Sequence, residues 1–355
     1  MKTFLLLFLS LLLVSCDSLQ FYTQAIRGQL SIVSKRENIQ SLVNDPDTDA
    51  SLRTQLETIL EIRRFAETEL GLPVNKNFSS YVNLERPFVV WNVFAAPEFS
   101  LVSDDWCFPV AGCVTYRGYF SEAAAENFAD KLKAETKDVY VGGVAAYSTL
   151  GWFTDPVLNT VINRDEFRLA ALIFHELAHQ VVYVSGDTEF NESFATAVEL
   201  EGLRRWVENG RGGENAENSS LSLSRVDNAT RQNQYRQEFV ELVQSYRPQL
   251  ESLYEESIPV NEKRQAKAAL FDQLREDYAA KKQQWQGYDV YDGWFASEIN
   301  NAKLNTVATY FNQIPAFNAL LVSVDYSLPD FYKKVEEFSE LDAVERKAVL
   351  AELAQ

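Results

Sequence analysis

The two histidines of this 355-residue chain lie in one pentapeptide, His175-Glu176-Leu177-Ala178-His179. On a helix, side chains four residues apart project from the same face, so these two imidazoles could bind one metal ion. The pattern H-E-x-x-H is typical of zinc hydrolases, in which the glutamate takes a proton from a water molecule that the metal activates. The pentapeptide therefore predicts a Zn²⁺ site with His175 and His179 as ligands and Glu176 as the catalytic base.

The chain around the pentapeptide has the composition of the helix that this chemistry requires. Residues 166–184 contain neither Gly nor Pro and are rich in helix formers, and Asn163-Arg164-Asp165 offers an N-cap. We expect this helix to continue about five residues beyond His179. Because the run is apolar on nearly every side, the helix should be buried, and buried imidazoles need partners. Two core histidines that hydrogen-bond to neighbouring groups are the alternative interpretation.

A catalytic zinc ion needs a third protein ligand, and the histidine count restricts what it can be. The extended pattern H-E-x-x-H-x-x-G-x-x-H is excluded, because no third histidine exists and residue 182 is Val instead of Gly. The third ligand should be a carboxylate or, less favourably, a cysteine thiolate. Of the three nearby acids, Glu192 is best placed, since Asp187 and Glu189 fall in the expected turn and in the first turn of the next helix.

A second helix is expected from Asn191 through Trp206, after a turn at residues 185–187. The turn reverses the chain, so Glu192 should return level with the two histidines. Glu199 follows seven residues later on the same face, where its carboxylate could accept a hydrogen bond from a ligand imidazole. The alternative for Glu199 is an ordinary exposed glutamate.

At these residues the chain resembles the gluzincin metallopeptidases, whose third zinc ligand is a helical glutamate. Asn191-Glu-Ser-Phe-Ala195 is similar to the N-E-x-F-A segment of the large aminopeptidases, although only twelve residues lie between His179 and Glu192. More of the chain resembles a bacterial family of lipoproteins described as putative aminopeptidases. That resemblance lies in residues 89–96, 106–114, 116–120, 146–153 and 300–304. It implies zinc-dependent hydrolysis of peptides.

The exact type of peptidase stays open. The G-x-M-E-N segment of the large aminopeptidases is absent, and residues 142–147 stand in its plausible place. An aminopeptidase must bind the α-ammonium group of its substrate, usually with carboxylates, and no such carboxylate is identified from the sequence. Exopeptidase and endopeptidase activity therefore both remain possible.

Peptide hydrolysis also needs a hydrogen-bond donor for the tetrahedral oxyanion. With both histidines assigned to the metal, the donor must be another residue or a backbone N–H. The candidates are Tyr116, Arg117 and Tyr147 from the family-like segments, and Asn300 and Tyr310 from the second half of the chain. The alternative for each tyrosine is a packing role, which most of the 16 tyrosines must have.

The N-terminus predicts export. Lys2 and the apolar run at residues 4–14 have the character of a secretory signal, so residues 1–15 are expected to be a signal peptide. Leu13-Val-Ser-Cys16 matches the lipobox of bacterial lipoproteins, which predicts a lipid anchor on Cys16; a plain signal peptide is the alternative. Asp17 resembles the signal for retention in the inner membrane. We expect a cell-envelope protein that faces the periplasm.

The remaining two cysteines, Cys107 and Cys113, are separated by five residues that include Pro109 and Gly112. Such a spacing suits a tight connection, and an oxidising compartment would permit a disulfide between them. Free buried thiols or metal ligands are the alternatives.

The charge of the chain restricts its partners. Its formal net charge is −18, which disfavours nucleic acid and repels anionic lipid head groups. Membrane attachment should therefore come from the lipid anchor and not from a basic surface. An acidic surface could attract the cationic ends of peptides, or could serve solubility alone.

The expected elements are helices at residues 20–43, 48–71 and 122–136, and strands at 87–95, 114–120 and 138–141. From about residue 194 nearly everything is expected to be helical, apart from a polar loop at 209–220. This order favours an α+β, zincin-like fold, with a small N-terminal mixed sheet, the H-E-x-x-H helix and a mostly helical C-terminal half. A sheet edge beside the zinc could pair with an extended peptide, and the candidate edges are residues 114–120 and 143–151.

The expected organisation after the signal peptide has three parts: a helical segment at 16–80, a catalytic core at 81–206, and a helical region at 207–355 packed on the core. Two functions of different class fit the sequence. The first is a membrane-anchored zinc peptidase, in particular an aminopeptidase. The second is a non-catalytic or endopeptidase-type lipoprotein of the same fold that binds an envelope protein. Glu176 argues against a non-catalytic role, because a structural metal site needs no base.

Overall fold

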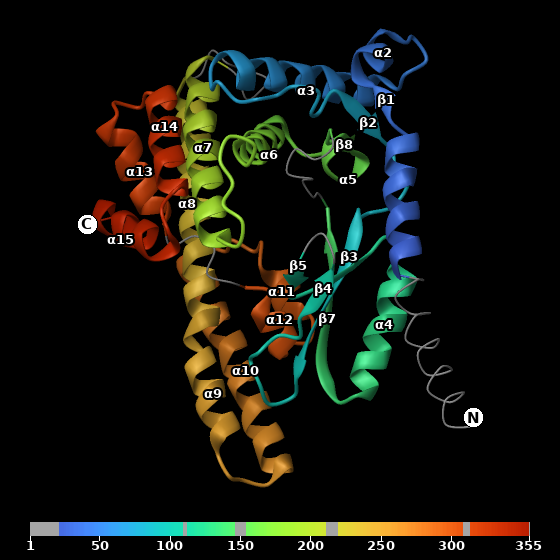
Figure 1. Ribbon diagram of the computed structural model, residues 1–355, viewed down its shortest axis with the longest axis vertical. Helices are drawn as coiled ribbons and strands as arrows, with labels where there is room; N and C mark the ends of the chain where they lie inside the picture. Colours follow the sequence, from blue (N-terminus) through green and yellow to red (C-terminus); the bar gives the residue numbers. More distant parts are fainter. Residues whose placement is uncertain (1–20, 109–111, 146–153, 211–218, 308–312, 355) are drawn as a thin grey trace, which may run out of the picture.

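A computed structural model describes residues 21–108, 112–145, 154–210, 219–307 and 313–354 (Figure 1). Residues 21–34 are helical, and the first half then alternates short helices with short strands. The bounds of its elements are β1 (Glu37–Asn38), α2 (Ile39–Asn44), α3 (Ala50–Thr68), β2 (Ser80–Val82), β3 (Val90–Pro97), β4 (Trp106–Phe108), β5 (Gly112–Val114), β6 (Arg117–Tyr119), α4 (Glu122–Ala134), β7 (Lys137–Val144) and β8 (Val157–Leu158).

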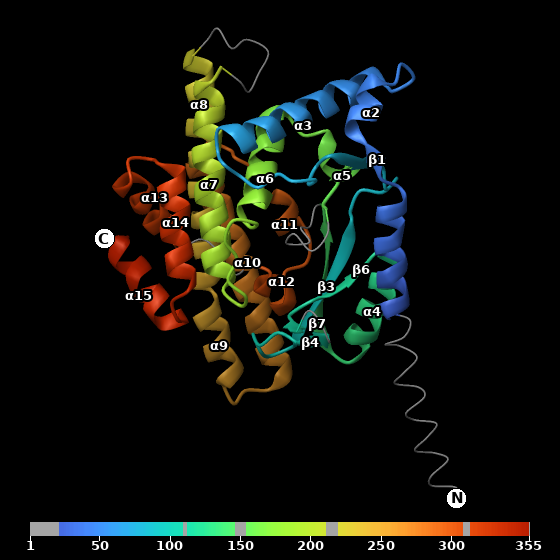
Figure 2. The same ribbon diagram turned by 45° about the horizontal axis from the view of Figure 1, so that its top comes forward.

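In the second half, the regular elements of the described residues are helices joined by turns and short loops. Its helices are α5 (Asn159–Ile162), α6 (Glu166–Ala178), α7 (Thr188–Glu208), α8 (Ser219–Ser245), α9 (Arg247–Glu255), α10 (Val260–Gln284), α11 (Asp292–Ala296), α12 (Asn301–Asn305), α13 (Ile314–Ser323), α14 (Leu328–Ser339) and α15 (Ala343–Leu353). Figures 1 and 2 show α7 and α8 side by side, with α13 and α14 against the outer side of this pair. No described helix is both long and apolar enough to cross a membrane.

The described strands form three small sheets, where the sequence predicted one small mixed sheet. The central sheet has the order β6-β3-β7 and is antiparallel, with Val90 opposite Val144 and Pro97 opposite Lys137 at the two ends of the β3–β7 pair. Alternate β3 side chains, those of Trp91, Val93 and Ala95, are buried in a core shared with α4. The second sheet, β1-β2-β8, is mixed, and the third is the β4–β5 hairpin.

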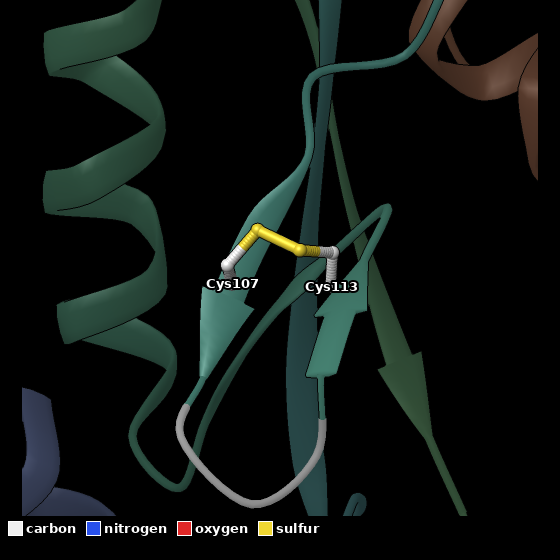
Figure 3. Close-up of a disulfide and its surroundings, with 2 residues drawn as sticks. All are labelled: Cys107 and Cys113. Carbon is white, nitrogen blue, oxygen red and sulfur yellow. A yellow bond between two sulfur atoms is a disulfide. The ribbon is translucent and has the colours of Figure 1, made fainter.

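The predicted disulfide is confirmed. Cys107 of β4 and Cys113 of β5 face each other across the hairpin and are joined through their sulfur atoms (Figure 3). The bond closes a loop of six residues' separation, and therefore constrains only the hairpin itself. Neither thiol is available as a metal ligand.

The largest hydrophobic core surrounds α6 and α7. It draws buried side chains from Ile39 near the N-terminus to Leu350 in α15, and includes Ile59 and Ile62 of α3 beside Phe174 of α6. The three predicted segments therefore share one core. A second core of aromatic and aliphatic residues holds α8 to α12 together.

Two predicted elements of the first half are interrupted. The helix expected at 20–43 is interrupted, because residues 37 and 38 extend to pair with β2, and the Asn38 side chain then accepts a hydrogen bond from Ser41 N and caps α2. The strand expected at 114–120 is two short strands, β5 and β6, which belong to different sheets. The signal peptide, Cys16, Asp17, Tyr147 and Tyr310 lie outside the described residues.

Candidate active site

Helix α6 carries His175 and Glu176 of the H-E-x-x-H motif on its less buried side. Asp165 caps it by accepting a hydrogen bond from Arg168 N at 3.0 Å, as the sequence predicts. Its apolar side is fully buried and packs on α3 and α7; the residues are Leu169, Ala170, Ile173, Phe174 and Leu177. His175 and Glu176 lie on the remaining arc and keep partial exposure. Burial of one side therefore fixes the rotation of the helix and the direction in which the motif points.

Helix α6 is shorter than predicted and ends at Ala178, with His179 as its C-cap. The chain then forms tight turns, in which Gln180 N donates to Leu177 O and Val181 N donates to Ala178 O. The side chain of Asn191 bonds both backbone groups of Val184, donating to its carbonyl and accepting from its N–H, each at 2.8 Å. These contacts hold the reversal between the two helices.

Helix α7 returns antiparallel to α6. Its cap, Asp187, accepts from Phe190 N and is paired with Arg346 of α15 at 2.8 Å, while Trp206 near its far end donates to Glu166 in the first turn of α6. Gly202 permits the close approach, because a Cβ there would lie 2.7 Å from the Phe174 ring. The pairing brings the start of α7 level with the end of α6.

Glu192 meets both histidines in this arrangement. Its two carboxylate oxygens lie 3.3 Å from His175 Nε2 and 3.6 Å from His179 Nε2. One ligand atom from each of the three residues can be chosen so that all lie within 4.8 Å of one another. His179 is 7% exposed and Glu192 31%, so the cluster opens to solvent on the glutamate side. The structure thus brings together the three residues that the spacing assigned to the metal.

Glu199 lies behind the cluster of His175, His179 and Glu192. It follows Glu192 by seven residues, or about two turns, on the same face of α7. Its Oε2 is 3.1 Å from His175 Nδ1, the ring nitrogen that points away from Glu192. Burial opposes a charge on His175, but hydrogen bonds to Glu192 and Glu199 raise the pKa of His175 to about 10. Burial, together with the charge on His175, lowers the pKa of His179 to about 4. Without a metal, the cluster therefore holds one protonated and one neutral imidazole.

The donor set fits a divalent metal ion. Tetrahedral zinc ligands at 2.0–2.2 Å lie about 3.3 Å apart, which is close to the two imidazole–carboxylate distances. The neutral His179 presents its Nε2 to a carboxylate oxygen, while its buried Nδ1, on the other side of the ring, has no hydrogen-bond partner among the described residues. A cation between the two Nε2 atoms and the carboxylate would coordinate all three groups. With two imidazoles and one carboxylate, the set matches the ligands that zinc takes at catalytic sites.

Glu176 lines two hollows beside α6. One is a pocket of about 420 Å³, which it lines together with His175, Glu192 and Glu199. The other is a smaller apolar cavity between α6, α3 and β8, lined by Phe78 and Leu172 among others. The carboxylate therefore stands beside the metal ligands at the wall of an accessible space, as a base acting on a substrate must.

The predicted oxyanion donors are placed differently from one another. Tyr116 is 40% exposed, and partial burial raises its pKa, with a smaller effect from neighbouring Tyr183. Arg117 lies in another pocket, where its guanidinium stacks 4.3 Å from the Phe21 ring centroid and 4.5 Å from that of Phe128. The structure does not bring Arg117 to the histidines. Asn300 is buried as the cap of α12 and donates to Val139 O.

Tyr183 is a site neighbour that the sequence reasoning missed. Its ring centroid lies 6.4 Å from that of His179, edge-on, and 48% of the residue is exposed. The spacing could have identified Tyr183 as a neighbour of the histidines, because residue 183 is four positions after His179 and eight after His175. Of the candidate edge at 143–151, residues 146–151 lie outside the described residues; its start is the end of β7, and the next residue, Ala145, packs on the core around α6 and accepts from Thr160 through its carbonyl.

The family comparison agrees with the resemblance drawn from the sequence. A model of the family described as "Putative aminopeptidase" matches residues 20–350, which include the H-E-x-x-H segment, Glu192 and Glu199. A search of the curated proteins and a search of the solved structures each found no match. Because the family model covers most of the chain, this protein belongs to the putative aminopeptidase family.

Proposed function

We propose that this protein is a zinc-dependent peptidase of zincin-like fold that acts as an aminopeptidase. The observation that carries the proposal is the convergence of His175, His179 and Glu192 beside Glu176, at the wall of a solvent-accessible pocket. The family match supports the peptidase class. Bound zinc would supply a Lewis acid that polarises the scissile carbonyl and lowers the pKa of water.

The side chains have separate roles in this mechanism. His175, His179 and Glu192 hold the metal. Glu176, which is next to His175 in the chain but not part of the ligand set, takes the proton of the attacking water and passes it to the leaving amine. Glu199 accepts from His175 Nδ1 and so fixes the tautomer and orientation of that ring, leaving Nε2 for the metal.

A hydroxyl donor for the oxyanion comes, in this proposal, from the tyrosines next to His179. Tyr183 contacts the His179 ring, and Tyr183 is close enough to Tyr116 to contribute to the raised pKa of Tyr116. Both side chains are substantially exposed, so a substrate can reach them. The edge of β7 would bind the extended substrate backbone by strand addition.

The proposed place of action is the cell envelope. The lipobox at Leu13–Cys16 and the preceding apolar run support export and lipid attachment at Cys16, and Asp17 favours the inner membrane. The Cys107–Cys113 disulfide fits an oxidising compartment. The net charge of −18 gives no basic surface for membrane binding, so the anchor would be required.

The decisive experiment separates metal binding from hydrolysis. We expect Glu176→Gln to retain one zinc per chain, measured by elemental analysis, and to lose at least about 100-fold in turnover of a peptide library. Glu126→Gln, which removes the same charge from an exposed position on α4, should retain both properties. Unchanged turnover in Glu176→Gln would eliminate the proposed base. Zinc-loaded wild-type protein that cleaves no peptide would instead favour a binding protein.

A further inference from the structure

The pocket beside the metal ligands is electrically divided along its length. At one end it is lined by the carboxylates Glu176, Glu192 and Glu199. Toward the other end it is lined by the guanidinium groups of Arg164 and Arg168, and Arg236 joins the lining from α8, where its charge also acts on Glu192. Grouping three arginines at one pocket is notable in a chain that carries 51 acidic and only 33 basic residues.

The positions of the arginines along α6 define the direction of this division. Arg168 precedes His175 by seven residues, or two helical turns, so it lies on the same face and about 10.5 Å nearer the N-terminus of α6. Arg164 comes just before the cap Asp165 and extends the same end. Arg236 reaches the pocket from α8, on the opposite wall.

The electrostatic effects indicate that the three cations are close together. Burial lowers the pKa of Arg164, and the charge of Arg168 lowers it further. Burial raises the pKa of Tyr288, while Arg168 and Arg236 both oppose that shift, so helices α6 and α8 present their charges to one place. Asp165 lies 3.5 Å from Arg168, but both side chains are more than 60% exposed, and such surface pairs are weak.

Neutralising the metal-site carboxylates does not explain all three arginines. The charge of Arg236 does help to lower the pKa of Glu192, against the effect of burial. Arg164 and Arg168 lie instead toward the N-terminal end of α6, with Arg168 two helical turns from His175. The charge of Arg168 acts on Arg164, where Asp165 partly offsets it, and on Tyr288, which does not line this pocket. An anion that enters with the ligand would reduce the repulsion between these positive charges.

We propose that the arginine end of this pocket binds a carboxylate of the peptide substrate, about three residues from the bond that is cut. This inference rests on the proposed peptidase function. An extended peptide covers 3.3–3.6 Å per residue, so about three residues span the distance from the metal ligands to Arg168. Guanidinium groups bind carboxylates through paired, charge-assisted hydrogen bonds. The carboxylate is either the free C-terminus of a short peptide or an acidic side chain of a longer one.

The test uses peptides that differ only in this carboxylate. One peptide ends in a free acid three residues after the scissile bond, a second ends in the amide, and a third is longer, with Glu or Gln at the same position. We expect wild-type protein to give a KM about tenfold lower for the acid than for the amide, if the terminus is recognised. A tenfold preference for Glu over Gln in the longer pair would assign the site to a side chain.

Variants then connect the preference to the arginines. Arg168→Gln should raise KM for the preferred carboxylate peptide about tenfold, leave its neutral partner unchanged, and leave kcat nearly unchanged. Arg236→Gln should raise the same KM, but it also removes a charge that acts on the ligand Glu192, so its kcat can change as well. Arg231→Gln is the matched control, because Arg231 lies on α8 but does not line the pocket and is five positions, or about 140° of helix rotation, from Arg236. The exposed position of Arg168 makes its variant safe for folding.

The same peptides also test binding in zinc-loaded Glu176→Gln protein by fluorescence anisotropy. A carboxylate preference that Arg168→Gln removes would support the inference even if no hydrolysis is detected. Equal affinity for all carboxylate and neutral peptides would overturn it. If wild-type protein hydrolyses acid and neutral peptides equally well, the arginine subsite fails while the peptidase function stands.

Discussion

Two buried polar clusters in this molecule contrast with each other: the His175–His179–Glu192 site and a cluster around α12. In the α12 cluster, Asn301 is fully buried and its side chain donates to three backbone carbonyls after β3, each at 3.1 Å, and accepts from Tyr254 Oη at 2.6 Å. Its backbone N–H donates to Asp138 Oδ2, which is also paired with Lys267 at 2.6 Å.

The α12 cluster is therefore a structural unit that joins the two halves of the chain. Lys303, also fully buried, donates to Trp294 O and Ser297 Oγ, and its ammonium lies 4.9 Å from the Trp294 ring centroid. These contacts pin α12 against β3, β7 and α10. Good pairing of this kind stabilises one arrangement and leaves little for a ligand to add.

The α6–α7 site is satisfied differently. Two imidazole nitrogens face one carboxylate, and the buried Nδ1 of His179 has no partner among the described residues. The contrast teaches that burial of polar groups alone does not indicate function. What distinguishes the site is that its groups converge on a common point where an added cation would complete them.

The largest expected effect is on the structural cluster. Asn301→Ala removes a donor to three carbonyls and leaves Tyr254 Oη without its acceptor, so the free energy of unfolding should fall by about 3 kcal/mol or more in urea titrations. The exposed Asn127→Ala should change stability by less than about 0.5 kcal/mol. Equal stability of Asn301→Ala and wild type would contradict the structural role.

Glu192→Ala is expected to affect metal binding more than stability. It removes the carboxylate ligand and should weaken zinc binding more than 100-fold, while the metal-free protein loses only the hydrogen bond to His175 and so less stability than Asn301→Ala does. Competition with a chromophoric chelator measures the affinity. Glu189→Ala, three residues earlier in α7, should keep zinc affinity. Undiminished zinc binding in Glu192→Ala would remove this residue from the ligand set.

Glu199→Gln should have a smaller effect on the metal. The amide cannot match the charge of the carboxylate that accepts from His175 Nδ1, so zinc affinity should fall about 10- to 100-fold. Glu199→Ala should lose more than Glu199→Gln, because the amide oxygen can still accept from Nδ1. If both variants bind zinc as wild type does, Glu199 is not a positioning residue.

The smallest effect concerns pH. In the metal-free folded chain the pKa of His175 is about 10, above its unfolded value near 6.5, so its contribution to stability is complete below about pH 6.5 and is lost as pH rises toward 10. Zinc needs the neutral ring and must displace this proton, whereas His179, with a pKa of about 4, is already neutral. At pH 7.5, calorimetry in buffers of different ionisation enthalpy should detect about one proton released per zinc. Heat that is independent of the buffer would refute this.

Local spacing predicted much of the site. The positions of His175, His179 and Glu192, and the contact of Glu199 with His175, follow from the 3.6-residue repeat and one reversal. Tyr116 and Arg117 show a limit. Neighbouring residues of an extended chain point to opposite sides, so both could not serve the site, and Arg117 instead packs on Phe21.

Other features depend on contacts between distant segments. Arg236 reaches the pocket from α8, and no spacing relates it to Glu192. The helix end at Ala178 was also missed, because composition alone favours continuation through the valines, while the Asn191 side chain holds Val184 in the reversal. The sequence predicted an α+β, zincin-like fold with one small mixed sheet, whereas the described strands form three short sheets. These sheets depend on distant pairings such as β2 with β8, in which Tyr81 lies opposite Val157, 76 residues later.

The double hydrogen bond between Asn191 and Val184 has a consequence for how such chains can vary. It closes the segment between these two residues into a ring, so the height of Glu192 is set by the five residues from His179 to Val184 and by the clamp. Residues added at the exposed Ser185 or Gly186 would enlarge the ring without moving the glutamate. The gap between the motif and its glutamate is therefore a tolerant length, whereas the adjacent Asn-Glu pair is the part that cannot be separated.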